Sequence, residues 1–192
     1  MKTGLNQGFP NQEINQKGYT IIELGIAVAI LAVLLIAGLS SVQGVLTSSK
    51  VNDQVKTVAR LSAKISANFS SASTSGITLS TIGNLGGWDP SKTTLVNNSV
   101  TAVKSSFNSG EFITTNNAAI GALNANSGFI YTISGVPSSA CADLANGISS
   151  LAYGIAVQAG TATTAVTSFP PTGTNTATLK AAGATTLDAA TV

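Results

Sequence analysis

IIELGIAVAILAVLLIAGL, residues 21–39, is the stretch that decides the fold of this chain. Its only ionisable side chain is Glu23. As an α-helix with a rise of about 1.5 Å per residue it extends roughly 28 Å, close to the ~30 Å thickness of the hydrocarbon core of a membrane. The sequence therefore predicts an N-terminal helix that is long and apolar enough to cross a membrane.

The helical pattern continues beyond this apolar stretch. Apolar side chains recur at three- and four-residue intervals, as they do along one face of an amphipathic helix, at Val51, Val55, Val58, Leu61, Ile65 and Phe69. No proline occurs between Pro10 and Pro90 to interrupt the chain. We therefore expect one helix over residues 21–68, apolar in its first half and amphipathic in its second.

A cleavable secretory signal peptide is the alternative interpretation of residues 21–39, with Ala37-Gly38 as a small-residue cleavage site. The apolar core of a signal peptide is normally shorter, begins nearer the N-terminus and carries no carboxylate. The helical pattern that continues past residue 50 also argues against it. A bare apolar helix cannot remain in water, so it must lie in lipid or in a bundle of identical helices. This favours a filament subunit that is stored in a membrane.

Residues 1–18 are polar, and their only charged side chains are Lys2, Glu13 and Lys17. Pro10 and the glycines of this segment oppose a helix. We interpret the segment as a leader. Lys17, next to its end, favours the cytoplasmic face of the membrane by the positive-inside rule.

The remainder of the chain predicts a mixed head domain. Residues 70–76, rich in Ser, Thr and Gly, end the helical pattern. Runs rich in Val, Ile, Thr and aromatic residues predict strands at residues 99–104, 111–115, 129–134, 153–158 and 162–169. One helix is expected at residues 139–151, with Ser138 or Ser139 as its N-cap. Residues 161–192 should form loops with one or two strands. The fold class is therefore α+β, a long N-terminal α-helix packed by its distal half on an antiparallel β-sheet.

Composition argues against several classes of function. The net charge is +2 with 8% charged residues, far from the basic excess of a nucleic-acid-binding protein. Lys56, Arg60 and Lys64 lie at four-residue intervals on one helix face, but a solvated or inter-subunit face explains so small a footprint. The chain has no His, so a membrane-anchored hydrolase would lack the usual base. We expect no enzyme activity, no cofactor, no metal and no specific nucleic acid.

The residues at the end of the leader, GYTIIEL at 18–24, resemble the precursor motif of the type IV pilin family. In that family a glycine precedes an apolar first mature residue, then Thr, two aliphatic residues, Glu and an apolar run. The resemblance implies that a prepilin peptidase cuts after Gly18 and methylates the amine of Tyr19, a position where Phe or Met is more familiar. It also implies that copies of the chain assemble into a helical filament from the inner membrane, through the pilus assembly machinery.

Glu23 has two interpretations. A carboxylate in hydrocarbon is costly unless it is paired or close to the membrane surface, so Glu23 could simply lie within a turn or so of that surface. The resemblance implies instead an assembly contact between Glu23 and the Tyr19 amine of a neighbouring subunit, where each charge compensates the other in a dry filament core. We favour the second interpretation.

Residues 129–141, Asp143-Leu144 and residues 153–160 look like the strand, Cys-bearing helix and strand of the type IVb branch. That branch includes toxin-coregulated-type pilins and the thin-pilus pilins of conjugative plasmids, and a long leader points to it too. In the branch the helix Cys pairs with a C-terminal Cys, but Cys141 is the only cysteine here. Cys141 is thus a candidate disulfide without a visible partner. Either a partner lies beyond the C-terminal end, or packing holds the loop around a buried structural Cys.

These observations predict a leader at residues 1–18, a transmembrane and assembly helix at 19–45, and a head domain at 46–192 that includes the amphipathic half of the helix. The expected function is that of a structural subunit of a type IVb pilus. The subunit is held in the inner membrane after leader cleavage and polymerises into an extracellular filament for adhesion, aggregation or conjugative cell contact.

The alternative is a minor pilin or a type II secretion pseudopilin. Major pseudopilins commonly bind calcium through clustered acidic residues, which supply the oxygen ligands that the ion needs. The acidic residues beyond residue 65 are instead widely scattered, at Asp89, Glu111, Asp143 and Asp188.

Overall fold

The computed structural model of the chain describes residues 20–69, 74–160, 162–172 and 176–185. They belong to two compact units, Met1–Gln43 and Gly44–Val192, which are described separately. Residues 20–43 of the first unit hold the beginning of a long helix. The second unit holds the rest of that helix and every strand among the described residues.

The long helix α1 extends over Ile21–Asn68, the bounds that the two hydrophobic patterns predict. Thr20 begins it, since its hydroxyl oxygen accepts a hydrogen bond from the Glu23 amide at 3.3 Å. A side-chain oxygen at this position satisfies an amide that the helix itself leaves unpaired. At the other end, the Phe69 amide donates to the Ile65 carbonyl at 2.8 Å. Hydrogen bonds therefore define both ends of α1.

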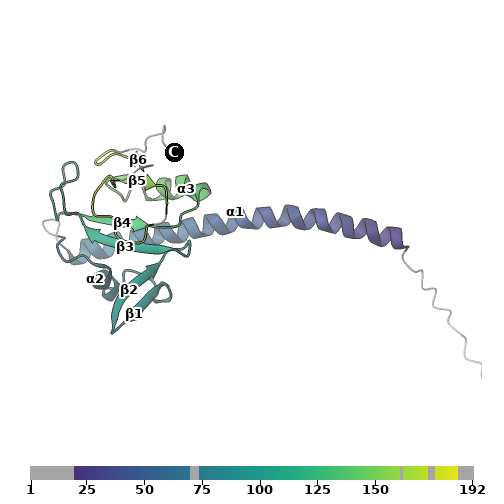
Figure 1. Cartoon of the computed structure of the whole chain (residues 1–192), viewed down its shortest axis with the longest axis horizontal. Helices are drawn as coiled ribbons and strands as arrows, with labels where there is room; N and C mark the ends of the chain where they lie inside the picture. The colour runs from purple at the N-terminus through teal and green to yellow at the C-terminus, as the bar shows by residue number, and fades with distance from the viewer. Residues whose placement is uncertain (1–19, 70–73, 161, 173–175, 186–192) are drawn as a thin grey trace, which may run out of the picture. The chain divides into compact units, whose positions relative to one another are not determined.

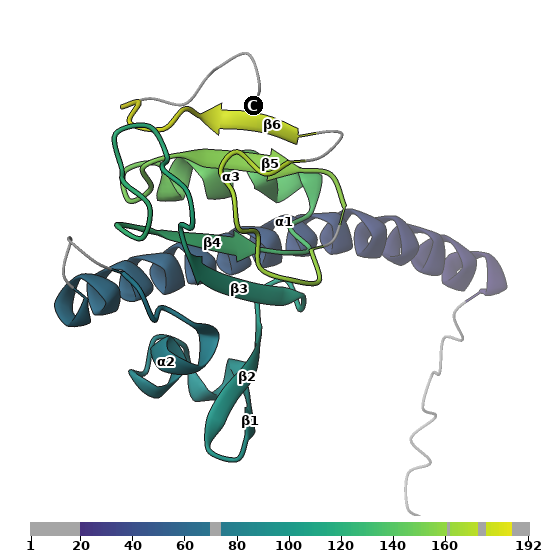
Figure 2. The same cartoon turned by 60° about the vertical axis from the view of Figure 1, so that its left-hand side comes forward.

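A four-stranded antiparallel sheet forms the centre of the second unit (Figure 1). In spatial order its strands are β1 (Thr93–Val96), β2 (Ser99–Lys104), β3 (Gly110–Thr115) and β4 (Phe129–Ile133). The predictions for β2, β3 and β4 are confirmed to within one residue at each end. The distal part of α1 lies behind β3 and β4, as Figure 1 and Figure 2 both show. The α+β class, with this part of the helix against an antiparallel sheet, is confirmed.

Strand β1 is absent from the sequence prediction. It pairs with β2 through a two-residue turn, in which Asn97 and Asn98 have φ values of 50° and 61° and Val96 pairs with Ser99. Both central residues of such a hairpin turn need positive φ, which asparagine tolerates better than most residues. An Asn-Asn pair is a weaker hairpin signal than Asn-Gly, and Leu95 and Val96 are both exposed, so β1 lacks the usual alternation of burial.

The core of the second unit lies between α1, the four-stranded sheet and a short helix, α2 (Leu79–Asn84). Its buried apolar side chains are Leu61, Ile65, Ile77, Ile82, Trp88, Val100, Val103 and Ile113. Gly83 allows α2 to approach β2 closely, because a Cβ atom there would lie 2.3 Å from Cγ2 of Val100. The 3-10 helix η1 (Pro90–Lys92) then leads into β1. Neither α2 nor η1 is long enough to have a helical period that the sequence could show.

A second, two-stranded antiparallel sheet pairs β5 (Ile155–Gln158) with β6 (Thr176–Lys180). Figure 2 shows this sheet and helix α3 (Ser138–Ile148) on the side of β4 away from β1. The predicted strand at residues 162–169 is wrong, because this stretch is an irregular loop and β5 pairs with β6 instead. Pro170 and Pro171 follow directly and cannot donate ladder hydrogen bonds, which disfavours a strand that ends there.

Helix α3 begins one residue before the prediction and ends three residues before it. The predicted N-cap is wrong, since Ser138 and Ser139 both lie in the first turn and the N-cap is Pro137, which makes no side-chain cap hydrogen bond. The backbone of Pro137 is extended, and its carbonyl accepts a hydrogen bond from the Ala140 amide at 2.9 Å. The fixed φ of proline suits the junction between a loop and a helix.

A lysine from β6 closes the C-terminal end of α3. Lys180 is 5% exposed, and its Nζ donates hydrogen bonds to the carbonyls of Ser149 and Ala152 at 2.5 and 2.6 Å. Carbonyls beyond the last turn of a helix lack internal partners, and the helix dipole favours a cation there. Lys180 therefore joins the second sheet to α3 through a buried charge-assisted contact.

Replacing Lys180 by methionine is expected to lower the free energy of unfolding by about 1–3 kcal/mol, because two carbonyls lose their donor. Urea unfolding of the full chain in detergent, followed by the fluorescence of the only tryptophan, Trp88, measures this change. Lys56→Met, at an exposed position on α1, is the matched control and should change the same quantity by less than about 0.5 kcal/mol. A Lys180→Met variant as stable as this control would contradict the capping role.

Candidate functional site

The largest exposed apolar surface of the described chain lies on α1, over residues 21–46, which we call the apolar segment. Every large apolar side chain in it is more than half exposed, from 54% for Val42 to 87% for Ile21. Exposed apolar surface of this extent marks contact with lipid or with another protein. Among the described residues, α1 is also the one helix that is long and apolar enough to cross a membrane, by length and composition.

The distribution of apolar side chains changes along α1. Exposed apolar residues follow one another within a single turn at Ile21, Ile22 and Leu24, so they point in different directions at about 100° per residue. Farther on, the buried residues Val51 and Leu61 belong to one face. A helix that is apolar all round lies in protein or membrane, whereas a one-sided helix covers a core. The two parts of α1 therefore require different surroundings.

Glu23 lies in the first turn of α1 and is exposed. With Thr20 as the residue that caps the helix, Glu23 completes the Thr-x-x-Glu pattern of a capping box. A negative charge in the first turn also interacts favourably with the positive end of the helix dipole. The three-residue spacing of Thr20 and Glu23 is the sequence signal for this pattern, which the sequence-based prediction did not include. The Glu23 carboxylate is exposed and therefore accessible to an intermolecular contact.

The other residues predicted for this end of the helix cannot be placed. Gly18 and Tyr19, the predicted cleavage and methylation positions, lie outside the described residues, as does the predicted leader at 1–18. The contact between Glu23 and a neighbouring Tyr19 amine therefore stays a prediction.

A buried carboxylate binds α1 to the sheet. Glu111 of β3 is 1% exposed, and its Oε1 accepts a hydrogen bond from Nε2 of Gln54 on α1 at 2.8 Å. Its Oε2 accepts one from Nε1 of Trp88 at 2.7 Å and a short one from the Tyr131 hydroxyl. We call these four residues the Glu111 cluster. Because they come from α1, β3, β4 and the loop before η1, the cluster connects elements that are far apart in the sequence.

Burial dominates the electrostatics of the Glu111 cluster. Desolvation raises the pKa of Glu111 above its ordinary value, and this exceeds the lowering by its three hydrogen-bond donors. Burial and the adjacent carboxylate raise the pKa of Tyr131 well above its ordinary value, so its hydroxyl remains a donor. In the sequence Glu111 is only one of several scattered acidic residues. Its place two residues before the buried Ile113 on one strand puts it on the inward face, and that alternation is the signal for its burial.

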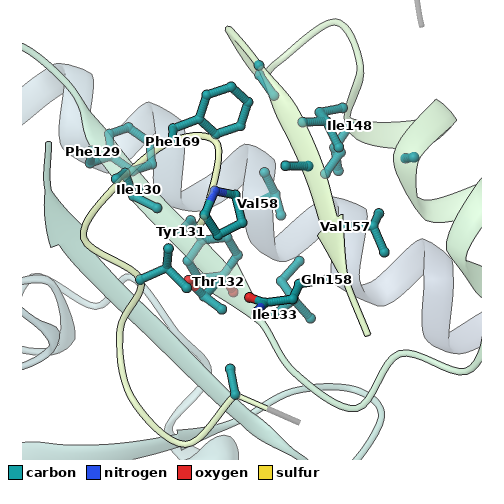
Figure 3. Close-up of a pocket in the computed structure, with 18 of the residues that line it drawn as sticks. Val58, Phe129, Ile130, Tyr131, Thr132, Ile133, Ile148, Val157, Gln158 and Phe169 are labelled. Atoms are coloured by element: carbon teal, nitrogen blue, oxygen red, sulfur yellow. The ribbon is translucent and has the colours of Figure 1, made fainter. Parts of the chain in front are cut away.

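A groove of about 570 Å³ separates β4 from β5. Figure 3 shows labelled side chains of both strands lining it, with Ile148 of α3 and Phe169 of the loop that follows β5. Its lining is largely apolar, and the hydroxyl of Tyr131, one of the lining residues, is bonded to Glu111. The groove therefore has the character of a packing surface between the two sheets.

Cys141 also lines this groove, from the first turn of α3. It is half-buried and has a free thiol, and burial raises its pKa, so the thiol stays protonated and weakly reactive near neutral pH. No partner cysteine exists in this sequence, and the predicted disulfide stays untested.

Within the described part of the chain, no group of three or more His, Cys, Asp or Glu side chains is arranged to hold a metal ion. Asp188, one of the scattered acidic residues, lies outside that part. Comparison with protein-family models, with curated proteins and with solved structures finds no match to this chain. The apolar segment with Glu23 is the surface of the described chain that requires a cover of lipid or protein.

Proposed function

We propose that this chain is a structural subunit of a type IVb pilus, made as a precursor that is cut after Gly18. The mature subunit is held in the inner membrane and then polymerises into an extracellular filament for adhesion, aggregation or conjugative cell contact. Its partners are copies of itself, the prepilin peptidase and the pilus assembly machinery. The observation that carries the proposal is the change in α1 from a helix apolar all round to one that is apolar on one face.

Two successive environments suit such a helix. Lipid can cover the apolar segment before assembly, and identical helices can cover it afterwards. Lipid tails are as apolar as packed aliphatic side chains, so the exchange between them costs little hydrophobic free energy. The amphipathic part meanwhile keeps its own sheet in both states, because Leu61 and Ile65 remain in the core.

Glu23 gives the assembly its specificity in this proposal. Apolar helices in a bundle have little to fix their relative height, whereas a buried carboxylate requires a cation at one height only. The first amine of a mature neighbour, at Tyr19, is such a cation, and it lies one turn before Glu23 in the sequence. A stagger between neighbouring subunits would bring the two together.

Intact-mass analysis of filaments sheared from cells tests the proposal. The expected subunit consists of residues 19–192 with one methyl group on the Tyr19 amine. Gly18→Val should leave uncut precursor in the membrane and no filaments, because a bulky side chain hinders close approach of a peptidase to the backbone. Gly8→Val, in the leader but away from the junction, is the matched control and should be processed normally.

Three results would count against this assignment. Filament subunits that keep residues 1–18, or that begin near Leu39, would exclude cleavage after Gly18. Filaments in which this chain is only a trace component would assign it to the minor pilins or the pseudopilins.

A further inference from the structure

A cleft on the second unit gathers basic side chains. It has a volume of about 220 Å³ and is lined by Lys50 of α1, Lys92 of η1 and Lys104 at the end of β2. Ser91 and Ser106 also line it. The whole chain has only nine Lys and Arg residues, so a third of its cations meet in this one place. We call it the lysine cleft.

The chemistry of the lysine cleft suits an oxyanion. Within the described residues, none of its lysines forms an ion pair with a carboxylate, and Lys92 donates only to Oγ of Ser106 at 2.9 Å. Among the lining residues, three ammonium groups face one carboxylate, that of Asp53, so the lining itself remains positive. Asp89 and Glu111 do not line the cleft, but both carboxylates lie close enough to Lys92 to interact with its charge. Ammonium and hydroxyl donors together are suited to the oxygens of a phosphate.

The wall formed by the turn between β2 and β3 is held in place. The amide of Ser106 donates to Oε1 of Gln54 at 3.0 Å, which ties the turn to the Glu111 cluster. Within the turn, Oγ of the buried Ser105 accepts hydrogen bonds from the amides of Phe107 and Ser109, both at 3.2 Å. A site with ordered walls loses less entropy when it binds a ligand.

The position of Lys50 in the sequence points to the source of the phosphate. Lys50 is the first charged residue after Glu23, and roughly 40 Å of helix separates the two at about 1.5 Å per residue. A bilayer with its headgroups is about 40–45 Å thick. If Glu23 lies at one membrane surface, Lys50 lies among the headgroups of the opposite leaflet.

We propose that the lysine cleft binds the phosphate of anionic phospholipid headgroups while the subunit waits in the membrane. The inference rests on the proposed function, since it needs the apolar segment to be in lipid. A nucleic acid fits less well, because single-stranded nucleic acids are held by aromatic stacking and long basic grooves. No aromatic side chain lines the cleft among the described residues.

The test uses the full chain reconstituted in nanodiscs of phosphatidylcholine, with an increasing fraction of phosphatidylglycerol. Amine acylation followed by mass spectrometry gives the reaction rate of each lysine, and Lys56 and Lys64 on α1 are internal references. We expect phosphatidylglycerol to slow acylation of Lys50, Lys92 and Lys104 and to leave the reference lysines unchanged. High salt should remove the protection, since it screens charges beyond about 3 Å at 1 M.

Substitutions give the size of the effect. Lys50→Gln should raise the phosphatidylglycerol fraction needed to protect Lys92 and Lys104 roughly fivefold, the contribution of one basic residue near an anionic surface. Asp53→Asn should lower that fraction, because it removes the one negative charge of the cleft. Lys56→Gln is the matched control and should leave it unchanged, and Trp88 fluorescence checks that each variant is folded.

Other results would overturn the inference. Equal acylation rates in both kinds of nanodisc would do so, as would equal protection of the reference lysines. Protection of detergent-solubilised protein by glycerol phosphate at a matched phosphate concentration would assign the cleft to soluble phosphates, and protection by an oligonucleotide alone would assign it to nucleic acid. If the chain stays in the nanodisc but phosphatidylglycerol does not slow acylation of the cleft lysines, only the headgroup site is refuted. A chain that leaves the lipid altogether refutes the proposed function.

Discussion

Replacing Glu23 by glutamine is expected to abolish filaments while the subunit remains folded and membrane-bound. The substitution keeps the size of the side chain and the Thr-x-x-Gln form of the capping box, but it removes the charge. If the carboxylate pairs with a neighbouring amine in the filament, loss of one partner of a buried pair costs about 3–5 kcal/mol per contact. At 1.4 kcal/mol for each factor of ten, the affinity of subunits for one another falls by more than about 100-fold.

Thr20→Ala is the variant that separates the charge of Glu23 from the capping of α1. It removes the hydroxyl that caps α1 and leaves the carboxylate in place, which should cost about 1 kcal/mol of helix stability and reduce filaments far less. The ratio of sheared filaments to membrane-bound subunit, measured by immunoblotting, compares the variants. Normal filaments with Glu23→Gln and few filaments with Thr20→Ala would show that assembly needs the cap of α1 and does not need the charge of Glu23.

Replacing Glu111 by alanine is expected to destabilise the head by several kcal/mol. Donors from Gln54, Trp88 and Tyr131 lose this acceptor together, and of the three only Nε2 of Gln54 keeps a second contact, with the Tyr131 hydroxyl at 3.2 Å. Each buried group left without a partner costs about 1–3 kcal/mol, so the loss at Trp88 and Tyr131 is a large part of the 5–15 kcal/mol that stabilises a typical domain. Urea unfolding followed by circular dichroism measures it, because Trp88 belongs to the cluster. Asp143→Ala, at an exposed acidic position, is the control and should have little effect.

The same carboxylate predicts a pH dependence with a definite sign. Because burial raises the pKa of Glu111 in the folded chain, the stability from its protonated form is fully present below the unfolded-state pKa. That contribution is lost as the pH rises through the higher folded-state pKa. Wild type should therefore gain stability relative to Glu111→Gln as the pH is lowered from neutral. If the difference in free energy of unfolding between wild type and Glu111→Gln stays constant with pH, or if the variant becomes the more stable of the two in acid, the pKa of Glu111 is not raised.

The sequence predicts those parts of the fold in which one pattern of residue types continues over a whole helix or strand. Helix α1 shows several turns of one pattern and no proline, so both its ends could be located. Strands β2 to β4 carry β-branched or aromatic residues between turn signals, and their bounds follow from that composition. Elements shorter than two turns or with both faces exposed, such as α2 and β1, leave no such pattern.

The parts that the sequence misses depend on partners distant in the chain. The sequence predicts one or two strands within residues 161–192 but not the bounds of β6, which forms because β5 offers it an edge to pair with. Glu111 and Gln54 are 57 positions apart, and no local rule brings an acid and an amide together across that distance. The capping contacts of Thr20 and Lys180 differ in how far the sequence can predict them. The contact of Thr20 with Glu23 follows a local three-residue spacing, whereas that of Lys180 depends on the packing of β6 against the end of α3.

The bond between Gln54 and Glu111 also fixes how far α1 can slide. The apolar face of α1 repeats itself every turn, so a shift by one turn would replace Val51 with Val55 and lose little apolar contact. Gln54 has no such substitute, because the residues one turn to either side are Lys50 and Val58, and neither can both donate to Glu111 and accept from Ser106. A force along the axis of α1 is therefore resisted at one position, by the hydrogen bonds of Gln54. Tension on α1 is passed to the sheet through these bonds and does not slide the helix along the sheet.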